Sequence, residues 1–159
     1  MDIRLEPSAE LGAEEVVIRY GVGADTLVLA RRLFAYAEEQ DGQVGMLTCF
    51  RRERKEEQEH LLPYAAILFF ETEGEVVYAH TVDAAYRVRW RLYELERLLP
   101  DGFIRISKST ILHMAHVTSV RRNLTASSPV TLRGTHKQVY VSRLYYKPLR
   151  EKMQQRYVE

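Results

Sequence analysis

Two short polar corners of the chain carry residues that could contact a nucleic acid. At the first corner, Ser107 and Ser109 flank Lys108 directly after an apolar segment. At the second corner, Ser142 is followed by Arg143. Hydroxyl and backbone donors of this kind bind phosphates, while a longer Lys or Arg side chain extends toward base edges. Taken alone, each corner is explained more simply as a cap beside a surface cation.

The charge of the chain is divided unevenly along its length. Residues 1–102 carry 12 Lys and Arg against 20 Asp and Glu, whereas residues 103–159 carry 11 Lys and Arg against 2 Asp and Glu. The net charge of +1 is therefore a cancellation of −8 by +9. A basic C-terminal third is expected of a protein that meets a polyanion with one face. A solvated basic surface without a partner would give the same distribution.

Histidines at 113 and 116 have a spacing that could bind a metal ion. Two imidazoles three residues apart chelate from one face of a helix, and His136 could be a third ligand. The residues around His113 and His116 indicate a strand, however, and no carboxylate or thiol lies nearby in the sequence. We therefore interpret these histidines as structural, and we expect no metal site and no cofactor.

The chain offers no catalytic motif. It has no Gly-rich phosphate loop and no nucleophile elbow. Glu71, Glu73 and Glu75 could gather carboxylates for acid-base chemistry, but a solvated hairpin end explains them more simply. The single Cys49 cannot form an intramolecular bridge and is expected to be buried. We expect no enzyme.

The location of the protein is predicted from its N-terminus and its apolar runs. No N-terminal segment combines a basic start with a long apolar stretch. The apolar run at 65–70 is far shorter than the roughly 20 residues that span a bilayer. Together with the single cysteine, these features predict a protein of the reducing cytoplasm.

Residues 1–44 are expected to form a short strand and a helix. The segment 16–20 is rich in β-branched residues, which favour a strand. Apolar residues between 29 and 37 recur at helical spacing until a polar segment at 38–42 closes the helix. We therefore divide the chain into this N-terminal segment, a larger unit at 45–152 and a tail at 153–159.

The larger unit is expected to be mostly sheet. Its apolar or alternating segments predict strands at 44–50, 67–70, 76–79, 86–91, 103–106, 117–120, 130–132 and 139–141. The strands at 67–70 and 76–79 form a hairpin, and the charged segment 51–59 is a solvated connection or exposed strand end. At 86–91, strict alternation places Tyr86, Val88 and Trp90 on one face and three arginines on the other.

Two short helices complete an α+β fold. Leucines at 92, 95, 98 and 99 predict a core-facing helix that ends before Pro100 and is too short for a zipper. A terminal helix is expected to begin at Arg143, with Ser142 as its N-cap and a helix N-terminus that favours anions. Pro148 inside this helix should shorten or kink it.

The order of these motifs resembles the LytTR family of DNA-binding domains. The resemblance is carried by Phe69-Phe70-Glu71, a Leu-x-x-Leu-Glu helix at 92–96, FIRISKSTIL at 103–112, VTSV at 117–120 and VSRLYYKPLR at 141–150. It covers about two thirds of the chain. It implies an elongated, mostly antiparallel multi-sheet β domain with short helices, whose loops enter successive major grooves of DNA.

The resemblance also assigns residues. Lys108 falls where the family often places Asn or Arg for base contact, and Arg143 matches the Arg that follows the late Ser. Arg105 matches the Arg at the strand end, where a phosphate contact and a structural pairing are equally expected. His113 stands where many relatives have Asn, so the hydrogen bond of that Asn is made here by an imidazole or lost. The full set of candidate DNA-contacting residues is Arg105, Ser107, Lys108, Ser109, Arg121, Arg122, Ser142 and Arg143.

The function that the resemblance implies is a bacterial transcription regulator that binds double-stranded DNA as a homodimer. Residues 1–44 would serve dimerisation or sensing. Stand-alone relatives commonly act beside a membrane protein, which suggests such a regulatory partner, and without a receiver domain we expect no phosphorylation control. The alternative is a small α/β protein-interaction module whose basic C-terminal face binds an acidic partner protein.

Overall fold

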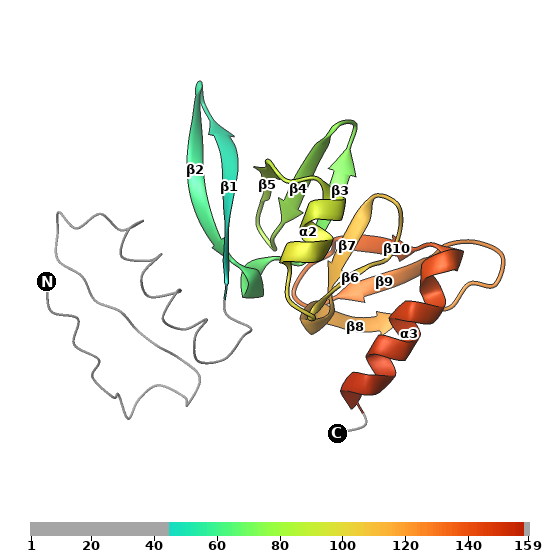
Figure 1. Ribbon diagram of the computed structural model, residues 1–159. Coiled ribbons are helices and arrows are strands. Elements are labelled where there is room, and N and C mark those ends of the chain that lie inside the picture. The colour runs from blue at the N-terminus through green and yellow to red at the C-terminus, as the bar shows by residue number, and fades with distance from the viewer. Residues whose placement is uncertain (1–44, 158–159) are drawn as a thin grey trace, which may run out of the picture.

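A computed structural model describes residues 45–157; the strand and helix predicted within 1–44 lie outside the described residues. In the described part, a seven-stranded sheet has the order β2-β1-β5-β4-β3-β7-β6, and a three-stranded sheet has the order β10-β9-β8 (Figure 1). Neighbouring strands pair antiparallel in both sheets. The predicted α+β class with mostly antiparallel sheets is confirmed.

The large sheet contains seven short strands, which are β1 (Met46–Glu53), β2 (Glu56–Pro63), β3 (Phe69–Glu73), β4 (Val76–His80), β5 (Ala85–Val88), β6 (Phe103–Arg105) and β7 (Thr110–His113). The small sheet contains β8 (Val117–Val120), β9 (Ser128–Leu132) and β10 (Gln138–Val141). Helix α2 (Leu92–Leu98) precedes β6, and helix α3 (Arg143–Tyr157) follows β10. Short 3-10 turns, η1 (Tyr64–Ala66) and η2 (Met114–His116), precede β3 and β8.

The large sheet has a hydrophobic core on each face. On β3, Phe70 belongs to a core that includes Leu95 of α2, whereas Phe69 belongs to a second core that includes Leu149 of α3. Successive side chains of a strand point to opposite faces, so one strand contributes to both cores. The continuous apolar run at 67–70 is typical of a strand that is buried on both sides. The sheet thus lies between α2 on one side and the small sheet with α3 on the other (Figure 1).

Two hairpins agree with the sequence analysis. The predicted pairing of 67–70 with 76–79 is confirmed, with Phe70 opposite Ala79 and Glu73 opposite Val76. Gly74 in the turn has φ of +62°, a conformation that glycine adopts without strain. The charged segment 51–59 forms the exposed outer half of the β1–β2 hairpin.

Three local predictions were wrong. The strand predicted at 86–91 ends at Val88, and Trp90 is 42% exposed. The strand cannot continue because Arg91 N–H donates to the Glu94 carboxylate, which begins α2 at this point. Leu98 was expected in the core, but a two-turn helix buries only one side and leaves it 52% exposed. Pro148 does not shorten α3, which continues to Tyr157, and the kink expected as the alternative stays a prediction.

Candidate nucleic-acid interface

The two polar corners predicted from the sequence adjoin each other in the fold. The first corner is the β6–β7 loop at 106–109, and the second is the junction of β10 with α3 at Ser142 and Arg143. The backbone N–H of Ser142 donates to the carbonyl of Ile106 at 2.9 Å. Ile106 itself is fully buried in the second core. One main-chain hydrogen bond therefore joins the two corners, and the buried Ile106 side chain fixes its position.

The β6–β7 loop is a tight turn with Lys108 at its tip. Ile106 N–H donates to the carbonyl of Thr110 at 3.0 Å and closes the turn. Inside it, Ser107 Oγ accepts from Ser109 N–H at 3.2 Å and lies 3.3 Å from Ser109 Oγ. Both serines are half-buried, whereas Lys108 is exposed. The serine hydroxyls thus help to hold the turn, and the Lys108 side chain is exposed at its tip.

Arg105 is bound within the protein. Its guanidinium donates to the carbonyl of Ser107 at 2.8 Å, to the carbonyl of Lys108, and to the Glu96 carboxylate at 3.0 Å. The Arg105 side chain is only 19% exposed. Of the two roles that the sequence left open, these contacts favour structural pairing: Arg105 fixes the loop backbone on both sides of Lys108.

At the second corner, Arg143 is the first residue of α3 and is exposed. Tyr145 N–H donates to the carbonyl of Ser142 at 3.0 Å, which begins the helix. The positive end of the helix dipole therefore lies beside the Arg143 guanidinium, and both attract anions.

Lys147 and Arg150 were not selected from the sequence. Both are exposed, and their helical spacing from Arg143 places all three cations on one side of α3. The i, i+4, i+7 pattern was the signal that could have identified them. Lys147 lies 3.9 Å from Glu151, a distance at which a solvent-exposed pair contributes little.

Arg121 and Arg122 lie at the same end of the small sheet as the second corner. Val141, the last residue of β10, is opposite Ser128, and Arg121 N–H donates to the carbonyl of Pro129 at 3.1 Å. The Arg122 guanidinium lies 5.4 Å from the centre of the Tyr146 ring in α3. Both arginines are exposed. The structure therefore brings this pair alongside α3.

His113, which stands where many relatives have Asn, makes a hydrogen bond inside the domain. Its Nδ1 donates to the carbonyl of Ile67 at 2.9 Å, and its ring is stacked on Phe103 with centroids 4.1 Å apart. The neighbouring His116 bonds through Nε2 to the carbonyl of Ala65 at 2.7 Å. The imidazole of His113 thus makes a buried hydrogen bond inside the domain, and both rings fasten η1 to β7 and η2.

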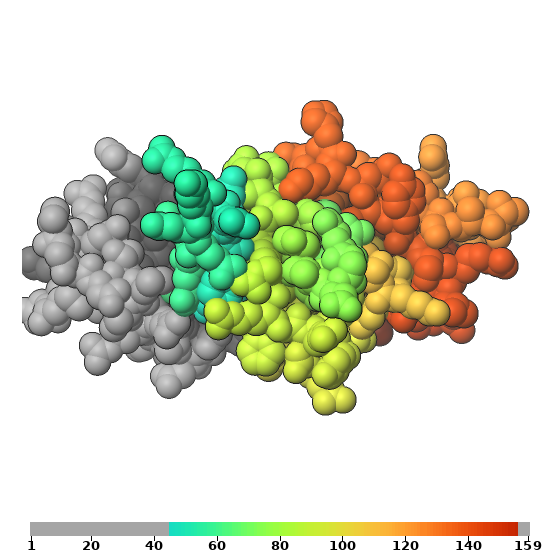
Figure 2. Space-filling model, turned by 90° about the horizontal axis from the view of Figure 1, so that it is seen from above, coloured from blue at the N-terminus to red at the C-terminus, as the bar shows by residue number. Residues whose placement is uncertain are grey.

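An acidic hairpin lies next to the first corner. Thr72 N–H in β3 donates to the carbonyl of Ser109 at 2.9 Å, so the β3–β4 turn projects beside the loop that carries Lys108. Glu73 and Glu75 are exposed as predicted, but Glu71 is half-buried, and burial together with the Glu73 charge raises its pKa. In Figure 2 the green hairpin and the yellow-orange β6–β7 loop share one surface with the red-orange C-terminal segments.

No helix within residues 45–157 is long and apolar enough to cross a membrane.

The chain is similar to a family model, to curated proteins and to a solved structure. A family model described as the LytTr DNA-binding domain matches residues 57–154. Two proteins of Staphylococcus aureus, from strains NCTC 8325 and MRSA252, are 31% and 30% identical over 94 residues, which is 59% of this chain and 63% of each relative. The chain thus spans less than two thirds of the length of these relatives.

Both relatives are named uncharacterized HTH-type transcriptional regulators. Within residues 45–157, however, α2 is followed by β6 and α3 by no further helix, so the described part contains no helix-turn-helix. A solved LytTr DNA-binding domain from Bacillus cereus superposes with a TM-score of 0.60 at 20% identity and covers 68% of this chain and 95% of that one. This likeness supports the fold described above.

Proposed function

Since the chain belongs to the LytTR family of DNA-binding domains, we propose that it is a transcription regulator that binds double-stranded DNA through its two adjoining corners. Lys108 and Arg143 contact base edges in the major groove. The neighbouring Ser107, Ser109 and Ser142 donate hydrogen bonds to phosphates. Arg121 and Arg122 contact the flanking backbone. Arg105 serves the interface by holding the loop.

The observation that carries this proposal is the hydrogen bond from Ser142 to Ile106. It makes one surface of two segments that the sequence separates. Both exposed cations lie close to this bond in the chain, since Lys108 follows Ile106 by two residues and Arg143 directly follows Ser142. Ile106 and Val141, which precede them, are buried in the second core. A backbone that is already ordered loses little conformational freedom on binding, which favours base contacts over a loose electrostatic association.

A salt series with genomic DNA fragments tests the proposal. Fluorescence anisotropy should show affinity that falls steeply with salt and a preference for some fragments. Lys108→Ala and Arg143→Ala should each weaken binding to a preferred fragment by about 1–3 kcal/mol, whereas Arg121→Ala should mainly lower the salt slope. No binding to any fragment at low salt would refute the proposal and favour the alternative of an acidic protein partner.

Arg133→Ala is the matched control. Arg133 is exposed like Arg143, but it follows β9 at the end of the small sheet opposite to the corner at Ser142. Its removal subtracts the same charge at a distance from the proposed interface. Equal losses from Arg133→Ala and Arg143→Ala would mean that only net charge matters, and the base-contact assignment would be withdrawn.

We further propose that the protein binds two half-sites as a homodimer, with residues 1–44 supplying the contact between the copies. This proposal rests on the family resemblance. Sedimentation of the full chain and of a variant without residues 1–44 tests it. A dimer that persists without those residues would place the contact in the DNA-binding domain.

A further inference from the structure

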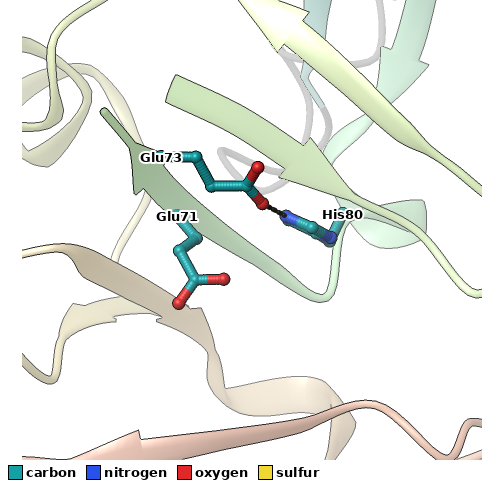
Figure 3. Close-up of side chains that lie close together, drawn as sticks. All are labelled: Glu71, Glu73 and His80. Carbon is teal, nitrogen blue, oxygen red and sulfur yellow. Dashed lines mark ion pairs between the residues drawn. The ribbon is translucent and has the colours of Figure 1, made fainter. Parts of the chain in front are cut away.

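Three side chains of types that can bind a metal ion lie close together on the acidic hairpin beside the first corner (Figure 3). Glu71 and Glu73 lie on one face of β3, and His80 lies at the end of the neighbouring β4. One ligand atom from each side chain lies within 4.8 Å of the other two. One imidazole nitrogen with two carboxylate oxygens is a donor set that divalent transition metals accept.

The His80 ring is held in place with a nitrogen that has no hydrogen-bond partner among residues 45–157. Its Nε2 atom is fully enclosed, and the nearest Glu73 oxygen, at 3.9 Å, is too distant for a hydrogen bond. The ring is stacked on Phe69 with centroids 4.4 Å apart, which fixes its orientation. A buried polar atom without a partner is unfavourable, and such atoms in native folds call for a ligand or a function.

The electrostatics around His80 leave the imidazole neutral and the carboxylates uncompensated. Burial, and next the Lys137 ammonium, lower the pKa of His80 to about 4. Lys137 donates to the carbonyls of Thr81 and Ala84. Among residues 45–157, no Lys or Arg forms an ion pair with Glu71 or Glu73.

We propose that Glu71, Glu73 and His80 bind one divalent transition-metal ion of the Zn²⁺ or Mn²⁺ type. Ligand atoms about 2.1 Å from one ion are at most about 4.2 Å apart, so the cluster needs only a small rotation of the glutamate side chains to close on it. The Glu73 side chain is 60% exposed, which leaves the remaining coordination positions open to water.

The position of this site gives the ion a consequence for DNA binding, and this step rests on the proposed function. Thr72 lies between the two glutamates in β3, and its backbone N–H donates a hydrogen bond to the carbonyl of Ser109 in the β6–β7 loop. Without an ion, the carboxylates repel phosphates close to Lys108; a bound divalent ion cancels their charge. Ion binding should therefore raise the DNA affinity by about fivefold or more, a typical size for coupling between two sites.

Calorimetry on the metal-stripped full chain, without DNA, tests the site. Titration with ZnCl₂ and with MnCl₂ should each show one equivalent, and MgCl₂ should bind far more weakly because Mg²⁺ prefers oxygen ligands alone. Glu73→Gln, which alters an exposed side chain, should abolish this binding, and so should His80→Gln. His136→Gln, which removes an exposed histidine outside the cluster, should leave it intact. Lys137→Met should tighten binding by removing a like charge.

No binding to the wild type, or unchanged binding in both Glu73→Gln and His80→Gln, overturns the site. The DNA arm is separate: Zn²⁺ should increase affinity for a preferred fragment in the wild type. In Glu71→Gln/Glu73→Gln, affinity should already be higher without metal, and Zn²⁺ should add nothing. Metal binding with unchanged DNA affinity would refute the coupling. Absence of DNA binding in every condition would refute the proposed function and leave the calorimetric result standing.

Discussion

Replacing Arg105 with Ala tests whether this residue positions the β6–β7 loop or contacts phosphate itself. The Arg105 guanidinium already donates to two loop carbonyls and to Glu96, and the side chain is 19% exposed. Few of its donors are left for DNA. We therefore expect Arg105→Ala to weaken DNA binding through Lys108, whose backbone it holds.

The size of the effect follows from the loop. Without the clamp, the backbones of Ser107 and Lys108 would be freed, and ordering them again on binding costs about 1–2 kcal/mol per residue. The loss cannot exceed the contribution of Lys108, about 1–3 kcal/mol for a good base contact, because the protein can bind without that contact. We therefore expect Arg105→Ala to lower affinity by about fivefold to 150-fold.

Fluorescence anisotropy with the two single variants and the double variant measures this dependence. If Arg105 acts through Lys108, then Arg105→Ala has little further effect in the Lys108→Ala background, since residues that work as a unit are not additive. The double variant should also keep the salt slope of Lys108→Ala. Additive losses, together with a slope smaller by about one phosphate contact, would refute the positioning role. Urea unfolding of each variant confirms that the measured protein is folded.

Three further predictions concern stability. His113→Ala should lower the free energy of unfolding, measured by urea denaturation, by about 2–4 kcal/mol. The substitution removes the hydrogen bond to the Ile67 carbonyl and opens a cavity against Phe103. A loss below about 0.5 kcal/mol would contradict this. Burial raises the pKa of the Cys49 thiol to about 12, so the native protein should resist thiol reagents, and stability should fall as pH rises above about 9, where the unfolded thiol ionises. The pKa of His80 is lowered to about 4, so the unfolded state binds more protons below about pH 6.5, and stability should fall from there toward pH 4. Urea melts at pH 7 and pH 5 should show that His80→Gln reduces this fall; an equal fall in both proteins would rule out His80 as its cause.

The local structure of the two corners could be predicted from the sequence. Strand periodicity followed by hydroxyl residues located the loop around Lys108, and the start of α3 was placed at Arg143. These features depend on neighbours in the chain. The clamp on Arg105 depends on Glu96 in a helix, and no local pattern indicates where that helix packs. The choice between a phosphate contact and a structural pairing for Arg105 therefore required the three-dimensional structure.

The acidic hairpin shows the same limit. Its turn could be predicted from the glycine between two strands, and that turn fixes the register that places His80 opposite Phe69. The pattern of glutamates suggested acid-base chemistry or, more simply, a solvated hairpin end, and it gave no sign of a histidine nearby. The His80 ring lies near Glu73 while stacked on Phe69, and its pKa is lowered by burial and by Lys137, which directly precedes β10. These are tertiary contacts that periodicity does not encode.

The β6–β7 loop is tied to three different elements, which explains how a turn can present a side chain with precision. Arg105 connects it to α2, Thr72 connects it to β3, and the bond from Ser142 to Ile106 connects it to the start of α3. The loop backbone is therefore already ordered, and under the proposed function the Lys108 side chain is the part of this loop that loses freedom on binding DNA. Sequence preference should then be changeable at Lys108 alone, by substitution with Asn or Arg, provided that all three ties remain.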